Sequence, residues 1–144
     1  MGYSPTDGLT MGTRSGQIDP MAVLALARTH GIDETAQLLN HQSGLKALGG
    51  THDMATLLQR TDPDARFAID HFCHHAARHA GSAITAMGGL DAIAFTGGIG
   101  ENAPLIRDKI TAQLAYLGPK PIHIIPAQEE RQIARDALSL INVP

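Results

Sequence analysis

Apolar and small residues recur at helical spacing across residues 63–87, which is the clearest pattern in the chain. The pair Asp62 and Pro63 precedes this stretch, and an aspartate followed by proline is a typical helix start. Gly88 and Gly89 follow it and favour a helix end. The pattern therefore predicts one long helix whose buried face is formed by Ile69, Phe72, Cys73, Ala76, Ala77, Ala80, Ile84 and Met87.

Two short apolar runs, residues 91–95 and 122–125, predict strands. The first run lacks alternation, as is typical of a parallel strand covered on both faces. Helices are predicted after each run, over residues 104–117 and 129–140, and Gly118 and Pro119 stop the first of them. The order strand, helix, strand, helix predicts a right-handed crossover and a parallel pair of strands.

The first 60 residues carry shorter signals. Residues 1–18 are rich in glycine and predict turns, while Asp19 and Pro20 predict the start of a helix that runs to about residue 30. Asp33 is expected to cap a short helix that ends near residue 40, and Asp53 to cap residues 54–60, with a loop and one turn of helix between them. The chain shows no internal repeat and no long linker, so residues 1–144 predict a single domain.

Composition excludes several classes of partner. A net charge of −3, no tryptophan and 3% aromatic residues argue against nucleic acid and against a membrane surface. The start MGYSPTDG lacks the basic and apolar regions of a secretory signal. A single cysteine, Cys73, excludes an internal disulfide and favours a reducing compartment, so we expect a cytoplasmic protein.

The stretch FTGGIGEN, residues 95–102, is the first candidate site. Three glycines lie between a predicted strand and a predicted helix, where a backbone can approach a ligand closely. The pattern is not a P-loop, because no Gly-Lys-Ser/Thr follows, and it is not GxGxxG either. Spacing alone leaves two interpretations open, a nucleotide or phosphate loop and a tight turn without a ligand.

Arg14, in the stretch MGTRSG, is the second candidate. A guanidinium between small residues can bind a phosphate or carboxylate in a bidentate manner. From the residue pattern alone, a solvated surface arginine is favoured.

The long predicted helix carries four histidines, His71, His74, His75 and His79. The pairs His71/His75 and His75/His79 have i,i+4 spacing, which can chelate zinc. No further ligand at suitable spacing completes the set, so a solvated polar face is favoured.

The pair Glu129 and Glu130 follows the second strand. These carboxylates can hold hydrated Mg²⁺ near phosphates, or they can complement the dipole of the following helix. The residues alone favour the second role.

Taken together, these stretches resemble one family, the acetate kinases. The segments MGYSPTDGLTMGTRSGQIDP, LNHQSGLKALGGTHDMATLL, FTGGIGEN and IIPAQEERQIARD each resemble a family motif, in the family's order, over about residues 1–138. The resemblance implies an α/β fold: part of the C-terminal domain of an actin-like (ribonuclease-H-like, acetate and sugar kinase) ATPase. It also implies the reaction of ATP with acetate to give acetyl phosphate and ADP, with Mg²⁺.

The same resemblance implies roles for individual residues. Arg14 corresponds to the arginine that stabilises the transition state, and Glu129 to the glutamate associated with Mg²⁺. Two stretches correspond to the nucleotide contacts: Asp53, Met54 and Ala55, and Gly98, Ile99, Gly100, Glu101 and Asn102. Ala55 stands where the family usually has an arginine, which should weaken nucleotide binding, and Gln17 and Gln128 replace the more usual Asp and Asn.

The resemblance extends only to the C-terminal part of the family's longer chains. No residue here corresponds to the family's catalytic aspartate, so we expect a partial domain, a fragment with negligible kinase activity alone. The family also implies a homodimer. Two alternatives stay open: a non-catalytic association module and a fragment of a propionate kinase.

Overall fold

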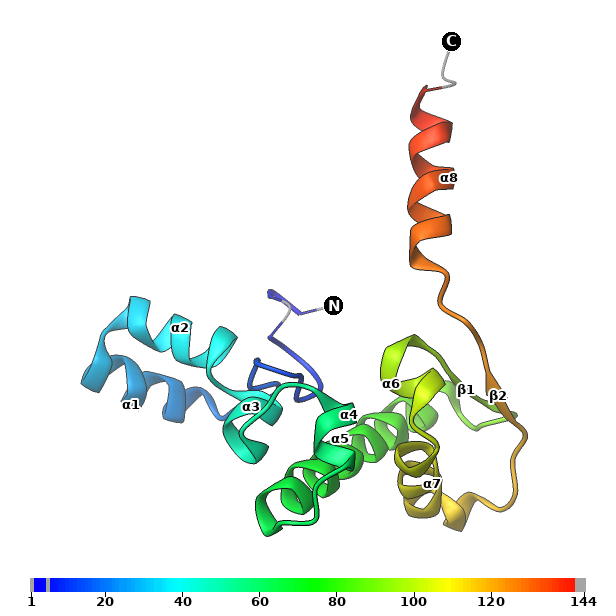
Figure 1. Ribbon diagram of the computed structural model, residues 1–144, viewed down its shortest axis with the longest axis horizontal. Coiled ribbons are helices and arrows are strands. Elements are labelled where there is room, and N and C mark those ends of the chain that lie inside the picture. Colours follow the sequence, from blue (N-terminus) through cyan, green and yellow to red (C-terminus); the bar gives the residue numbers. More distant parts are fainter. Residues whose placement is uncertain (1, 5, 142–144) are drawn as a thin grey trace.

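The computed structural model describes residues 2–4 and 6–141, so residues 1 and 5 of the predicted turn region lie outside it. Helix α5 (Pro63–Met87) crosses the middle of the molecule (Figure 1). Its ends are those that the sequence predicts. The Asp62 carboxylate accepts a hydrogen bond from the Ala65 N–H, and Gly88 closes the other end in the left-handed conformation, at φ 77°.

Two groups of helices pack against α5 and form the core. The short helices α3 (Gly44–Gly49) and α4 (Met54–Leu58) lie against its first half, and α7 (Pro104–Gln113) also packs on it. Burial of apolar side chains between them is the main stabilising contribution. The largest fully enclosed side chains are Leu45, Leu57, Cys73 and Ile106.

The sheet consists of two parallel strands, β1 (Ile93–Phe95) and β2 (Ile122–Ile124), with Ile93 opposite Ile122. The connection between them contains α6 (Gly97–Asn102), α7 and the 3₁₀ turn η1 (Ala115–Leu117). The predicted parallel pair is confirmed. The expectation that the first strand is covered on both faces is wrong, because Ala94 of β1 is exposed.

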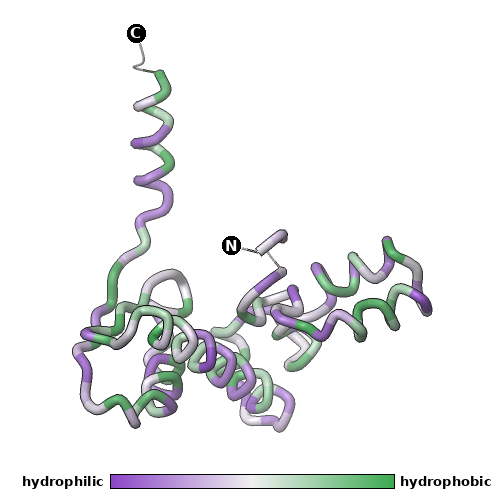
Figure 2. Tube along the Cα trace, turned by 180° about the vertical axis from the view of Figure 1, so that it is seen from behind, coloured by the Kyte–Doolittle hydropathy of each residue, from purple (hydrophilic) through white to green (hydrophobic). Residues whose placement is uncertain are grey.

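Two parts extend from this body (Figure 1). The antiparallel pair α1 (Pro20–His30) and α2 (Ile32–His41) forms one of them, and α8 (Glu129–Ile141) forms the other. Figure 2 shows apolar positions on both extensions, and neither α1 nor α8 has a buried residue. Their apolar residues therefore meet solvent in this chain.

Several predicted boundaries require correction. Asp33 does not cap α2, because the helix begins at Ile32 after Gly31, and Asp33 lies in its first turn. Helix α4 ends at Leu58 rather than near residue 60, and the helix predicted over residues 104–117 is divided into α7 and η1. Helix ends depend on a few local hydrogen bonds, which a periodic pattern does not fix.

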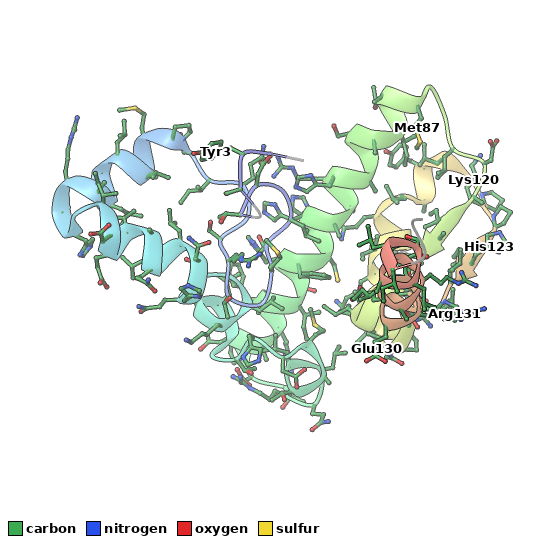
Figure 3. The ribbon with its side chains drawn as sticks, turned by 90° about the horizontal axis from the view of Figure 1, so that it is seen from above. Tyr3, Met87, Lys120, His123, Glu130 and Arg131 are labelled. Atoms are coloured by element: carbon green, nitrogen blue, oxygen red, sulfur yellow. The ribbon has the colours of Figure 1, made fainter. Side chains whose placement is uncertain are left out.

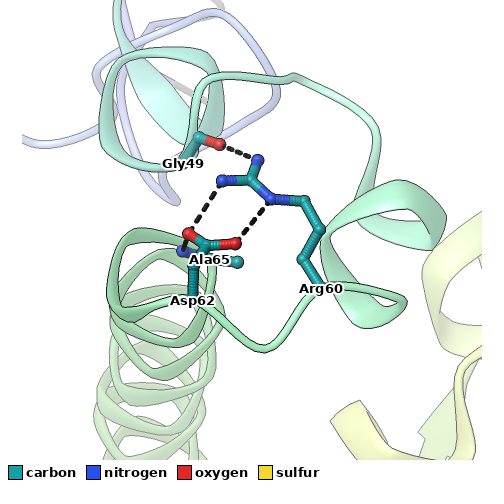
Figure 4. Close-up of polar contacts among 4 residues, drawn as sticks. All are labelled: Gly49, Arg60, Asp62 and Ala65. Carbon is teal, nitrogen blue, oxygen red and sulfur yellow. Dashed lines mark hydrogen bonds and ion pairs between the residues drawn. The ribbon is translucent and has the colours of Figure 1, made fainter.

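An ion pair fixes the turn between α4 and α5 (Figure 4). The Arg60 guanidinium donates two hydrogen bonds of 2.8 Å to the Asp62 carboxylate and a third to the carbonyl oxygen of Gly49. Hydrogen bonds from Arg60 and from the Ala65 N–H lower the pKa of Asp62 to about 2. The pair thus joins the ends of α3, α4 and α5 at one point.

Candidate functional site

A cleft of about 490 Å³ opens between the start of α4 and helix α6. It brings together the two stretches that the sequence predicts as nucleotide contacts, although they lie more than 40 residues apart in the chain. Its lining consists of His52, Asp53, Met54, Ala55, Leu58, Gly98, Ile99, Asn102 and Ala103.

Asp53 shapes the first wall of the cleft. Its carboxylate accepts hydrogen bonds from the Ala55 and Thr56 N–H groups, at 3.2 and 3.0 Å, and from the Thr56 hydroxyl. The hydroxyl and then the backbone bonds of Thr56 lower the pKa of Asp53, so the carboxylate is charged at neutral pH. The predicted cap is therefore confirmed, and it places a negative charge on this wall.

The electrostatics of the cleft suit an uncharged group. Its lining is mainly apolar, with Met54, Leu58, Ile99 and Ala103, and within the described part of the chain it contains no lysine or arginine. A carboxylate beside an apolar slot can accept hydrogen bonds from ribose hydroxyls but repels phosphates. The cleft therefore fits the nucleoside part of a nucleotide better than its phosphates.

The second wall is a helix and not the predicted glycine loop. Residues 97–102 form α6, in which the Asn102 side chain donates to the Gly98 carbonyl at 2.9 Å. Arg107 donates to the carbonyl oxygens of Gly100 and Glu101 at the end of α6. Gly98 has open space where a side chain would begin, so it leaves the cleft accessible.

Gly100 and Glu101 do not line this cleft, so their predicted role as nucleotide contacts stays a prediction. Gly100 packs closely on Phe95 of β1, where an added Cβ would lie 3.4 Å from the backbone carbon. The Glu101 carboxylate points elsewhere and accepts hydrogen bonds from the Gly97 and Ala127 N–H groups.

Arg14 lies in a loop that the start of α3 holds in place. The N–H groups of Ser43, Leu45 and Lys46 each donate, at 2.9 Å, to the carbonyl oxygens of Thr13, Met11 and Gly12 in that order. Sequence reasoning missed this support, because the contacts join residues about 30 positions apart.

Gly44 permits the close approach of this loop. It adopts φ +64°, and a Cβ at this position would collide with the Met11 carbonyl oxygen and lie 2.7 Å from that of Arg14. The signal in the sequence that could have revealed the contact is the glycine after Ser43, because glycine readily adopts the left-handed conformation.

The Arg14 loop adjoins the cleft. An added Cβ at Gly12 would lie 3.1 Å from the carbonyl oxygen of His52, which lines the first wall. The Arg14 side chain is half-buried, and the two ion pairs found within residues 2–4 and 6–141 use Arg60 and Lys109 instead. Its guanidinium therefore stays available for an anionic ligand.

Glu129 is the first residue of α8 and is exposed. Figure 3 views this helix end-on, and the neighbouring Glu130 and Arg131 side chains spread outward from it. Among the described residues, no three His, Cys, Asp or Glu side chains gather as a metal site. A single carboxylate of this kind fits Mg²⁺ that keeps its waters and binds the phosphates of a substrate.

The histidine face of α5 is less solvated than the sequence suggests. His71 is half-buried, its Nε2 lies 3.0 Å from the Thr10 hydroxyl, and its ring centroid lies 4.3 Å from that of His75. Burial, followed by the neighbouring His74, lowers the pKa of His71. His71 thus anchors the segment that leads to Arg14 and takes no part in a metal site among the described residues.

The model of the Acetokinase family matches residues 1–138. The chain belongs to this family. The resemblance to acetate kinases that the motifs carry is thereby confirmed, as is the actin-like partial fold.

Individual relatives and solved structures of the acetokinase family are also similar to this chain. Acetate kinases of Solibacter usitatus (strain Ellin6076) and Nitrobacter hamburgensis are each 40% identical over 98% of this chain. The acetate kinase structure from Entamoeba histolytica superposes with a TM-score of 0.90 at 25% identity, over 96% of this chain and 44% of that one. A propionate kinase from Francisella tularensis gives 0.88 at 38% identity, over 94% and 42%.

The acetokinase-family chain spans 41% of the length of each of those two curated relatives. None of the helices in its described part combines the length and apolar character that a membrane crossing needs.

Proposed function

We propose that the chain is the nucleotide-binding part of an acetate-kinase-type phosphotransferase, which converts ATP and acetate into ADP and acetyl phosphate. The observation that supports this most directly is the cleft. It joins the stretch of Asp53 and Ala55 to that of Gly98 and Ile99, as the family's nucleotide contacts require. The family match over residues 1–138 supports the same reaction class.

In this proposal the cleft holds the nucleoside, and the charged chemistry takes place outside it. A carboxylate oxygen of the substrate attacks the γ-phosphorus, and the bond between that phosphorus and the ADP oxygen breaks. The transfer depends on positioning and on neutralising charge rather than on covalent catalysis. Arg14 would stabilise charge on the transferred group. Glu129 would hold Mg²⁺, which neutralises phosphate charge when bound.

The substrate is a short-chain carboxylate, either acetate or propionate, because relatives of both names align with the chain. Since the chain spans only 41% and 42% of the length of those relatives, we propose that it turns over slowly or not at all by itself. A cytoplasmic location is part of the proposal and is consistent with the free, buried thiol of Cys73.

A titration with a fluorescent ADP analogue tests the cleft. The substitution Gly98→Leu should weaken binding at least about tenfold, because the new side chain starts in open space and extends into the cleft. Ala86→Leu, on the exposed surface of α5, is the control and should bind like the wild type. Absence of saturable binding to the wild type, or unchanged binding to Gly98→Leu, would contradict the proposal.

A second candidate function is association, with a second copy of the chain as partner. An apolar groove of about 590 Å³ runs between α5, β1 and α7. Phe72, Ile84, Ile93, Phe95 and Ile110 are among its lining residues. An apolar groove favours occupation by apolar side chains of another surface.

A further inference from the structure

One carboxylate oxygen links two segments that are distant in sequence. Glu101 Oε1 accepts a hydrogen bond of 2.9 Å from the Gly97 N–H and one of 3.0 Å from the Ala127 N–H. Gly97 begins α6, the helix whose next residues line the cleft. Ala127 lies two residues before Glu129. Glu101 Oε1 thus joins α6, the second wall of the cleft, to the segment that carries Glu129, the proposed magnesium residue.

Other contacts hold the Ala127 segment weakly. The ladder between the strands continues only as far as the Ile125 N–H, which donates to the Phe95 carbonyl at 2.8 Å. Beyond it, α8 has no buried residue that could anchor the segment through packing. Gln128, between Ala127 and Glu129, adopts φ 49°, which is uncommon for a residue other than glycine. The bond from Ala127 to Glu101 is therefore well placed to fix where α8 begins.

We propose that Glu101 is a positioning residue that couples magnesium binding at Glu129 to nucleotide binding in the cleft. This inference rests on the proposed function. Glu101 itself touches neither ligand: its Oε1 is occupied by two backbone donors, and its residue does not line the cleft. It acts by holding Glu129 at a constant position relative to α6. Loss of such a support around a metal ligand typically costs about 10- to 100-fold in metal affinity.

Two substitutions separate positioning from direct charge. Glu101→Ala removes both hydrogen bonds. Glu101→Gln loses the charge but keeps a side-chain carbonyl oxygen, which has two lone pairs and can accept from both N–H groups. A positioning residue should therefore tolerate glutamine, whereas a direct metal ligand should not. Glu34→Ala, exposed on α2, is the control for loss of one negative charge.

The first measurement is backbone amide hydrogen exchange on the full chain without ligands. Glu101→Ala should accelerate exchange at Gly97 and Ala127 by about tenfold or more, while Glu101→Gln and Glu34→Ala should leave it near the wild-type rate. Unchanged exchange at both amides in Glu101→Ala would overturn the positioning role, whatever the chain binds.

The second measurement is ADP affinity with Mg²⁺ and with a chelator. Wild type should bind ADP more tightly with Mg²⁺ than with the chelator. Glu101→Ala and Glu129→Gln should each lose about tenfold of this gain in ADP affinity. Glu101→Gln should retain the gain. If Glu101→Ala keeps the full gain, or Glu101→Gln loses it, the coupling is overturned although the nucleotide site stands. A wild type that binds no nucleotide overturns both the proposed function and the coupling of magnesium to nucleotide binding. In that case amide hydrogen exchange at Gly97 and Ala127 still decides whether Glu101 is a positioning residue.

Discussion

Gly44 shows how much of the candidate site depends on one residue without a side chain. Its backbone at φ +64° carries the α3 N–H groups that hold residues 11–13 beside the cleft. Any Cβ there would push against the backbone of Met11 and Arg14, neither of which can rotate away. The position of the Arg14 loop therefore depends on Gly44 having no Cβ.

The substitution Gly44→Ala tests this contact. We expect it to lower the free energy of unfolding by more than about 2 kcal/mol, because backbone strain and a collision add together. Gly88→Ala is the matched control: it has a similar φ, 77°, but open space around the new Cβ, so it should cost about 1 kcal/mol. Urea denaturation measures both. Equal costs would show that the Arg14 loop moves aside without penalty.

At the scale of single elements, α5 and α6 show what sequence can and cannot predict. The ends of α5 are encoded locally by Asp62, Pro63 and Gly88, so a pattern of residues suffices to place them. The sequence predicts a glycine loop where α6 forms, and three glycines within four positions disfavour a helix. Side chains of Glu101, Asn102 and Arg107 bind its backbone instead, and such contacts are not visible in a periodic pattern.

The candidate site also has a part that the sequence predicts and a part that it does not. The residue types of the cleft follow from the family motifs, and the structure brings Asp53, Met54 and Ala55 opposite Gly98, Ile99 and Asn102. What the motifs do not contain is the packing of α4 and α7 on α5 and of α6 on α7, which places α6 opposite α4 across the cleft. Gly100 and Glu101 belong to the same motif, yet they do not line the cleft.

The histidines of α5 predict a dependence of stability on pH. Burial lowers the pKa of His71 and of His75 from the usual 6.5, and neighbouring histidines add to the shift. The unfolded chain therefore binds more protons near pH 6, and stability must fall as the pH drops through this range. Stability held by Asp53 and Asp62, whose pKa values are lowered, is lost only as the pH falls below about 4.

Thermal unfolding measured between pH 7.5 and 5.5 tests the histidine contribution. The midpoint Tm should decrease over this window in the wild type and decrease less in His71→Gln, which keeps a partner for Thr10. His123→Gln, exposed on β2, is the control and should keep the wild-type slope. A slope that is the same in all three proteins would assign the pH dependence to other groups.

For the molecule as a whole, the apolar groove and the extended α8 leave much hydrophobic surface uncovered. Ile122, Ile124 and Ile125 are each about 50% exposed, and Leu138 and Leu140 on α8 are more so. A chain with this surface is expected to associate, and light scattering over a range of concentrations measures it.

A charge placed in the groove tests where the copies meet. Ala83 lines the groove on α5, so Ala83→Glu should weaken association at least about tenfold, since a buried unpaired carboxylate is costly. Ala86→Glu lies on the same helix outside the groove and should associate like the wild type. A wild type that stays monomeric at high concentration would remove association as a function of this chain.

Cys73 makes the opening of this core measurable without an introduced reporter residue. It is the sole cysteine of the chain, it is 1% exposed, and burial raises the pKa of its thiol to about 11. A disulfide reagent at neutral pH therefore reacts only with molecules in which α5 has separated from its neighbours. The chain has no tryptophan to report on unfolding by fluorescence, so the rate of Cys73 modification measures how often the native packing opens.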